Sequence, residues 1–285
     1  MKQNAMSAAV PDAAGGWQAA LSLRFTAGAD RTRMHREVGC GPLYVQKPFY
    51  PEGPVCHAYL LHPPGGVVGG DALRINVAVE TQASALLTTP ASSKFYRSTG
   101  ALARQDIRMS VDDDASCEYL PQGTIVFPGA RVRSSALFQL APHARLVTAD
   151  VLCLGQPAND QRFDQGSYEQ HLRIERRDPQ TGAMRPLLSD RLRFKAGASQ
   201  QQAPWGLDGR YCLGTCYATP VDADQLALLR ERHPRLPLTC VRSVLIARLL
   251  DDDPETVSLA LRALWSDLRP MLLQRPALAP AIWRT

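Results

Sequence analysis

The sequence predicts a mainly β fold, a stack of sheets resembling a β-helix, with two α-helices near the C-terminus. Three observations lead to this prediction: strand-like alternation fills the first two-thirds of the chain, a strand–turn–strand unit recurs, and helical periodicity appears only late. The chain has 285 residues, 45% of them hydrophobic. This composition is that of a globular protein, and the length suffices for one large domain or two ordinary ones.

Alternation of apolar and polar side chains begins near Trp17 and predicts a strand over 17–26 with one buried face. Residues 73–79 alternate in the same way. Other apolar stretches lie between clusters of Pro, Gly and Asp, and we expect them to be strands as well. They cover residues 55–61, 124–127, 131–140, 145–154 and 239–250.

An imperfect repeat runs through this region. Each copy is an alternating strand, a polar turn, an Ala and a second strand, and the copies cover residues 73–90, 106–121 and 136–150. The Ala positions are Ala83, Ala115 and Ala144. Repeats of this length often stack and bury their apolar faces against one another. A stacked-sheet or β-helix-like architecture fits the pattern, and so does a large sandwich.

Two helices are expected at about 222–233 and 255–274. Asp222 is a capping residue for the first, and Asp253-Pro254-Glu255 combines a cap, a first-turn proline and an acidic first turn for the second. Apolar residues of the second helix recur with a 3.6-residue period, which predicts an amphipathic helix packed on the β core. We expect Trp265 or Trp283 to anchor the C-terminus.

The domain organisation expected is a flexible Ala-rich tail over 1–16 and one domain over 17–285 that is β-rich to about residue 220. The tail has a single Lys2 and no apolar core, so we expect no export signal. Seven cysteines at irregular spacing then favour reduced thiols and a cytoplasmic location.

The charge balance argues against two classes of partner. The formal net charge is +5, and only four of the 32 cationic residues are Lys. Arg suits bidentate pairing at interfaces or in internal ion pairs, although the bias can equally reflect a GC-rich genome. Without a dense basic run we expect no nucleic-acid binding, and without an apolar run of about 20 residues no membrane span.

The segment His62-Pro-Pro-Gly-Gly-Val-Val-Gly-Gly-Asp71 is the most unusual one. It differs from phosphate-binding loops because a strand, not a helix, follows it. We therefore expect a tight double turn whose glycines adopt positive φ.

Known chemical motifs are otherwise missing from the sequence. Cys56-His57 with His62, and Cys212 with Cys216, do not have the paired spacings of a closed zinc site. On a strand, Cys56 and His57 would also point to opposite faces. No nucleophile elbow or His-Glu-x-x-His segment occurs, so we predict no catalytic site.

Taken together, five segments resemble the urease accessory protein UreD family, also called UreH. They are GPLYVQKPFYPEGPVCHAYLLHPPGGVVGGD (41–71), LLTTPASSKFYRS (86–98), YLPQGTIVFPGARV (119–132), LCLGQPA (152–158) and AIWRT (281–285). The segments follow one another in the family order, and the resemblance covers about 17–285. The residues that carry it most clearly are His62, Pro63, Pro64, Gly65, Gly66, Gly69, Gly70, Asp71, Thr89, Pro90, Lys94, Phe95, Tyr96, Pro121, Gln122 and Trp283.

The resemblance implies an assembly chaperone without catalytic activity of its own. UreD-like proteins dock on apo-urease and recruit UreF and the GTPase UreG for GTP-dependent nickel insertion. The family fold is β-helix-like with a C-terminal helical part, and an internal water-filled tunnel is thought to conduct nickel.

The chain departs from the family pattern at several positions. Gly123 stands where an acidic residue is usual, and Pro128 where Asp is usual. Gln156 replaces Arg, Gln161 replaces Glu, and Ala281 replaces Arg. Charges that the family commonly keeps are therefore missing, while the Gly/Pro framework is intact.

A nickel path should bind the ion weakly, through dispersed oxygen and nitrogen ligands. We expect no tightly bound cofactor and only transient nickel contacts, with Asp71, Asp150, His62 and Cys56 as candidates. Each Asp could equally cap a turn or pair with an arginine. Two other classes stay open: a β-solenoid enzyme such as a carbohydrate lyase, and a stand-alone metal-binding protein.

Overall fold

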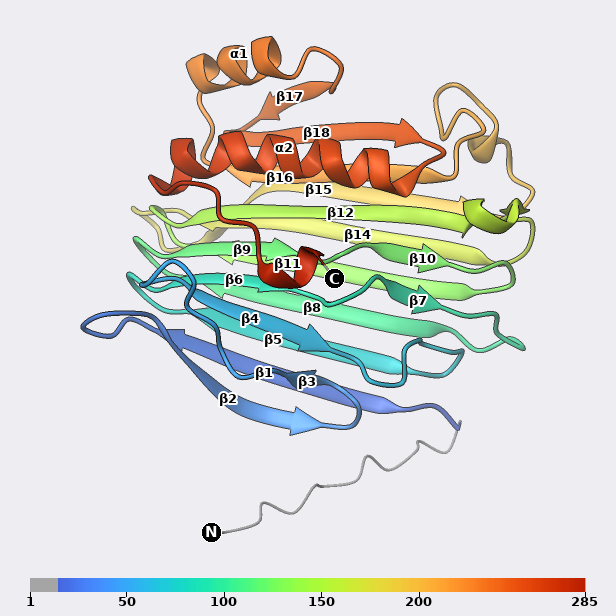
Figure 1. The fold of residues 1–285 in the computed structure, drawn as a ribbon, viewed down its shortest axis with the longest axis horizontal. Helices are drawn as coiled ribbons and strands as arrows, with labels where there is room; N and C mark the ends of the chain where they lie inside the picture. Colours follow the sequence, from blue (N-terminus) through green and yellow to red (C-terminus); the bar gives the residue numbers. More distant parts are fainter. Residues whose placement is uncertain (1–14, 285) are drawn as a thin grey trace.

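The computed structural model describes residues 15–284 and consists mainly of two β-sheets that face each other (Figure 1). Residues 1–14, most of the expected tail, lie outside the described residues. Gly16 is buried, and a Cβ built on it would lie 2.1 Å from the carbonyl carbon of Gly70. The ordered fold therefore begins before the first strand.

The first sheet, called sheet 1, is continuous from one edge strand to the other. Its order is β15 (Met184–Lys195), β14 (Ser167–Arg177), β11 (Arg131–Leu140), β8 (Ala103–Val111), β5 (Ala72–Val79), β1 (Gln18–Thr26) and β2 (Arg33–Cys40). The pairs from β1 to β14 are parallel, and the two edge strands pair antiparallel.

The second sheet, called sheet 2, lies opposite. Its order is β17 (Leu238–Val241), β18 (Val244–Asp251), β16 (Cys212–Thr219), β12 (Arg145–Gln156), β9 (Ser116–Leu120), β6 (Ser84–Thr88), β4 (Cys56–Leu61) and β3 (Tyr44–Val45). Three short strands attach to it beside this path: β7 (Ser93–Phe95), β10 (Thr124–Val126) and β13 (Gln161–Arg162).

The chain passes from sheet 2 to sheet 1 and back, which forms stacked coils resembling a β-solenoid of about four turns. The repeat found in the sequence marks these coils. Ala83, Ala115 and Ala144 are each fully buried, one before each of β6, β9 and β12. The amide of Ser116 donates to the carbonyl of Ala83, and that of Arg145 to the carbonyl of Ala115, both at 3.0 Å. The stacked-sheet prediction is confirmed.

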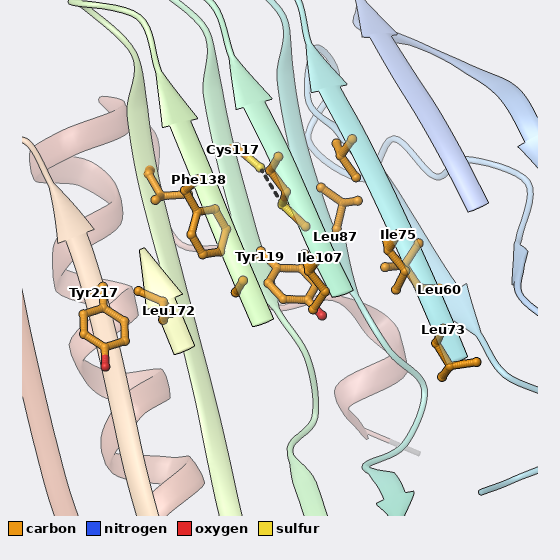
Figure 2. Close-up of a cluster of buried hydrophobic side chains, with 14 of the residues drawn as sticks. Leu60, Leu73, Ile75, Leu87, Ile107, Cys117, Tyr119, Phe138, Leu172 and Tyr217 are labelled. Carbon is orange, nitrogen blue, oxygen red and sulfur yellow. Dashed lines mark hydrogen bonds between the residues drawn. The ribbon is translucent and has the colours of Figure 1, made fainter. Parts of the chain in front are cut away.

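The main hydrophobic core lies between the two sheets (Figure 2). Ile75 and Ile107 of sheet 1 and Leu87 and Tyr119 of sheet 2 belong to it. Along β1, buried and half-buried side chains alternate from end to end, as the sequence predicts. Burial of apolar surface at about 25 cal/mol per Å² makes this core the main stabilising contribution.

Both predicted helices are present: α1 (Ala223–Arg232) and α2 (Pro254–Leu273). Asp222 caps α1 in a capping box with Gln225, and both carboxylate oxygens of Asp253 accept backbone amides at the start of α2. The apolar stripe of α2 packs on the far face of sheet 2, where it forms a second core. Both faces of sheet 2 are therefore covered, whereas the outward side chains of sheet 1 are half-buried or exposed.

The hairpin of β14 and β15 is the main element that the sequence does not reveal. Residues 156–170 show no period, yet β14 begins at Ser167 and pairs with β15 over its whole length. Charged and polar side chains occupy most outward positions and β15 is an edge strand, so the apolar signal is weak. Three 3-10 turns complete the described structure: Pro157–Asn159, Ser199–Gln201 and Ala281–Arg284. In residues 15–284, no helix has the length and hydropathy to cross a bilayer.

Candidate functional site

Three of the sequence motifs are joined side by side by main-chain and hydroxyl hydrogen bonds. The amide of Val67 donates to the carbonyl of Lys94 (2.7 Å), and the amide of Tyr96 donates to the carbonyl of Val67 (2.9 Å). The amide of Gln122 then donates to the hydroxyl of Thr89 at 2.9 Å. The Gly-rich segment, TTPASSKFYRS and LPQG therefore form one continuous surface at the ends of the coils.

The Gly-rich segment between β4 and β5 uses its glycines in two different ways. Gly65 and Gly70 have φ of +76° and +98°, as expected for a double turn. Gly66 does not have positive φ; a Cβ there would lie 2.0 Å from the ring of Tyr96. The expectation of positive φ is therefore wrong for Gly66 and for Gly69. At Gly66 the absence of a side chain leaves room for the ring of Tyr96.

A cavity of about 170 Å³ lies between the first two motifs. His62, Gly66, Thr89, Pro90 and Lys94 line it. Tyr119 and Ile75, both in the main core, line its inner end, so the cavity extends from the motif surface into the space between the sheets. Pro63 and Pro64 are exposed beside it, and Phe95 is fully buried beneath.

Asp71 ends the Gly-rich segment and is only 3% exposed. One carboxylate oxygen accepts the amide of Trp17 at 2.8 Å and the other that of Val68 at 2.9 Å. These contacts hold the start of β1 against the start of β5. Burial lowers the pKa of nearby His62, and the Asp71 carboxylate opposes that shift.

Asp150 is half-buried on β12 and accepts a hydrogen bond from Thr124 at 3.1 Å. Burial raises its pKa to about 6, although Thr124 and the amide of Val151 act in the other direction. Burial, with a contribution from Asp150, also raises the pKa of Tyr119 and of Tyr168, both residues of the main core. A carboxyl group therefore lies close to tyrosines of the main core.

Further motif residues meet beside α2. Pro121, Gln122 and Trp283 line a small cavity of about 30 Å³ together with Asp150. Arg262 of α2 donates to the side chain of Gln122 at 2.8 Å. The indole of Trp283 donates to Thr88 at 2.9 Å. The C-terminal motif thus closes over the LPQG motif, from which it is distant in sequence.

The four nickel candidates do not form one ligand cluster. Among residues 15–284, no group of three or more His, Cys, Asp or Glu side chains could hold a metal ion. Cys56 faces the main core, where burial raises the pKa of its thiol to about 11, while His57 on the next position contacts Glu52 on the opposite face. His62 and Asp71 are neighbours at the Gly-rich end, and Asp150 lies with the interior tyrosines.

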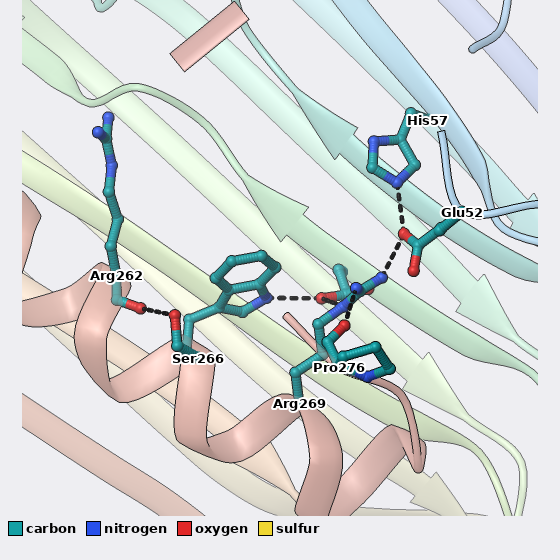
Figure 3. Close-up of polar contacts among 8 residues, drawn as sticks. Glu52, His57, Arg262, Ser266, Arg269 and Pro276 are labelled. Atoms are coloured by element: carbon teal, nitrogen blue, oxygen red, sulfur yellow. Dashed lines mark hydrogen bonds and ion pairs between the residues drawn. The ribbon is translucent and has the colours of Figure 1, made fainter. Parts of the chain in front are cut away.

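A buried ionic network at the α2 interface has no counterpart in the sequence predictions (Figure 3). Arg269 is fully buried and contacts Glu52 at 2.5 Å and Glu118 at 3.1 Å. Glu118 also accepts from the indole of Trp265 at 2.6 Å, and Glu52 from His57 at 2.6 Å. Two features of the sequence could have indicated this network: Arg269 lies on the apolar stripe of the helix, and Glu118 lies within an otherwise apolar strand.

Burial and the contacts within this network shift the pKa values of its members in different directions. Burial raises the pKa of Glu118, while Arg269 and Trp265 oppose the shift. Burial would also raise the pKa of Glu52, but the contacts from His57 and Arg269 lower it overall. The guanidinium of Arg269, whose pKa the two carboxylates raise against the effect of burial, is the centre of the network.

Two of the departures from the family pattern lie opposite each other. Gln156 of β12 and Gln161 of β13 are register partners in an antiparallel pair. Both positions carry neutral amide side chains in this chain. At Gly123, φ is +121° and a Cβ would lie 2.9 Å from the carbonyl oxygen of Val151, which explains why glycine fits there.

Comparisons with known proteins identify the family of this chain. The model of the UreD urease accessory protein family matches residues 18–284. The urease accessory protein UreD of Pseudomonas putida (strain W619) is 43% identical over 274 residues, which are 95% of each chain. Those of Citrobacter koseri and Alkalilimnicola ehrlichii are 42% and 38% identical over 278 residues, 95% of this chain and 92% of theirs. The chain therefore belongs to the UreD family of urease accessory proteins, and this membership indicates a role in urease maturation.

Proposed function

We propose that this chain is a non-catalytic scaffold that docks on apo-urease in the cytoplasm and recruits UreF and the GTPase UreG. With them it supports GTP-dependent insertion of nickel into the urease active site. Family membership over nearly the whole chain carries the proposal, and the accessory names of the relatives favour a role without catalysis.

The proposed route for nickel runs from the Gly-rich cavity toward Asp150. His62 and Lys94 line the cavity, and Tyr119 links it to the interior polar group. These groups are spread out rather than gathered around one point. Dispersed ligands suit a cargo that must be released, because a closed tetrahedral site would retain the ion.

Asp150 has a property that suits weak binding. Because its pKa is about 6, the carboxyl ionises just below neutral pH, and a proton competes with a metal for it. Both carboxylate oxygens of Asp71 accept backbone amides, so we propose for it a smaller share in the path and a larger one in folding.

The test is co-expression of urease with its accessory proteins, with and without this chain and with the variants Asp150→Asn and Asp71→Asn. Nickel per urease active site, urease activity and recovery of the complex are measured. Asp30→Asn, on an exposed turn between β1 and β2, is the matched control. We expect Asp150→Asn to reduce nickel loading with the complex intact, and Asp30→Asn to change nothing.

Normal nickel loading by Asp150→Asn in an intact complex would reject the proposed path. Full urease activation without this chain would reject the maturation role itself. Equilibrium dialysis of the chain alone against nickel separates a scaffold, for which we expect weak binding, from a stand-alone nickel-binding protein.

A further inference from the structure

The outward face of sheet 1 carries a concentration of arginines. Strands β5, β8, β11, β14 and β15 point alternate side chains away from the core. We use the name basic face for the outward positions of these five strands, represented by Arg74, Arg104, Arg108, Arg133, Arg191 and Arg193, all exposed. Part of the Arg excess noted in the sequence is thus gathered on one surface.

Most of these cations lack a carboxylate partner. Within residues 15–284, Arg74, Arg104, Arg108 and Arg191 make no ion pair, while Arg133 and Arg193 share the single carboxylate of Glu169 at 3.5 and 2.9 Å. Internal ion pairs therefore do not account for these four arginines.

Two of the arginines lie directly opposite each other. Arg104 of β8 and Arg133 of β11 are register partners in neighbouring parallel strands, and Arg133 is in turn opposite Glu169. Like charges at directly opposed positions destabilise a sheet. The isolated chain therefore gains no stability from placing Arg104 opposite Arg133.

We propose that the basic face is a docking surface for a protein partner whose contact surface is rich in Asp and Glu. Guanidinium groups bind carboxylates in a bidentate manner and lose less hydration than ammonium groups do. Asp106 and Glu175 lie among the arginines and would repel a continuous phosphate backbone, which favours a protein over a nucleic acid. A link to urease assembly rests on the proposed function above.

The first test measures binding of poly-L-glutamate to the full chain at low and at physiological salt. The variant Arg104→Glu/Arg108→Glu reverses two unpaired charges of β8, and Arg104→Gln/Arg108→Gln removes them. Arg235→Glu, exposed beyond α1 and without an ion pair among the described residues, is the matched control. Thermal unfolding verifies that each variant is folded.

We expect salt-sensitive binding that weakens about tenfold or more in the charge-reversed variant, less in the neutral one and not in the control. Absence of binding by the unaltered chain, or equal binding by the reversed variant, would overturn the proposal. Tighter binding of a 20-base-pair DNA duplex than of poly-L-glutamate at the same salt would also overturn it, in favour of nucleic acid.

A second arm uses apo-urease, UreF and UreG in a pull-down with the same variants. Loss of capture by the reversed variant, with capture by the control, assigns the basic face to the assembly. Equal capture by both would refute that assignment while leaving the maturation role standing. Failure of the unaltered chain to capture any of them would count against the proposed function. The poly-L-glutamate experiment would still decide whether the basic face binds an acidic partner.

Discussion

Glu118 of β9 and Arg269 of α2 form an ion pair at 3.1 Å although 151 positions separate them in the chain. Both side chains are almost completely buried, with 2% and 0% of their surface exposed. Arg269 also donates to the carbonyl of Pro276 and contacts Glu52, so one guanidinium joins the C-terminal helix, the segment after it and two distant parts of the β-structure. The position of α2 on sheet 2 therefore depends on this one side chain as well as on apolar packing.

Removing Arg269 should be among the most damaging single changes in the protein. We predict that Arg269→Met lowers the free energy of unfolding by about 3–5 kcal/mol, because two buried carboxylates lose their cation. Urea denaturation of the purified variant measures the effect.

The control for this prediction is Arg232→Met, which breaks the exposed pair with Asp267 and should cost about 0–1 kcal/mol. Adding Glu118→Gln to Arg269→Met should recover part of the loss. If the two arginine variants were equally stable, the network would have no special role.

Asp150 should make the stability of the protein depend on pH. Its pKa rises from 3.8 to about 6 on folding, so the folded state favours the protonated carboxyl. The stability of the folded state that comes from this carboxyl is fully present below about pH 4 and is lost as the pH rises through about 6. We predict that Asp150→Asn is more stable than the unaltered chain by about 3 kcal/mol at pH 7.5 and nearly equal to it at pH 4. Denaturation curves at the two pH values decide; a difference that is the same at both would contradict the prediction.

Gly66→Val should destabilise the Gly-rich segment by steric overlap, since the new side chain meets the ring of Tyr96. That ring packs on Phe127, with ring centroids 4.6 Å apart, so moving it away would cost this contact. We predict a loss of about 1–3 kcal/mol. The second change Tyr96→Ala should relieve the overlap, so the double variant should lose less than the sum of the two single losses. Additive losses in thermal or urea unfolding would show that the overlap is not the cause.

Gly70→Val should also destabilise the protein, but through backbone strain, because φ at this position is +98°. We predict that the strain lowers the free energy of unfolding by about 1–3 kcal/mol. No second substitution should relieve it. Gly70→Ala should be nearly as harmful as Gly70→Val, because the strain comes from any Cβ. A harmless Gly70→Ala in an unfolding experiment would refute this explanation.

Truncation after Pro254 should give insoluble protein. It removes the apolar stripe of α2 from the far face of sheet 2 and exposes buried residues such as Leu120 and Val147. It also leaves Glu118 without Trp265 and Arg269. A soluble truncated chain with an unchanged thermal midpoint would contradict the prediction; deletion of residues 1–14 is the matched control and should leave solubility unchanged.

Local pattern was enough for much of the fold. The alternation of β1 and β5, the buried Ala83, Ala115 and Ala144, and both caps of the C-terminal helices follow from period, turn chemistry and capping. These features depend on residues within one element or one turn. For the same reason the sequence failed at the β14–β15 hairpin, whose strands are identified by their long-range pairing with β11 rather than by their own pattern.

The sequence by itself determined the family, because the Gly/Pro segments are long and distinctive, and it determined which residues those segments contain. Only the tertiary structure decided which of them meet. The stacking of the coils joins Val67 to Lys94 and Gln122 to Thr89, and the return of the chain over sheet 2 brings Arg269 to Glu118. Contacts between residues this far apart are set by the register of the stacked strands, and no local period records that register.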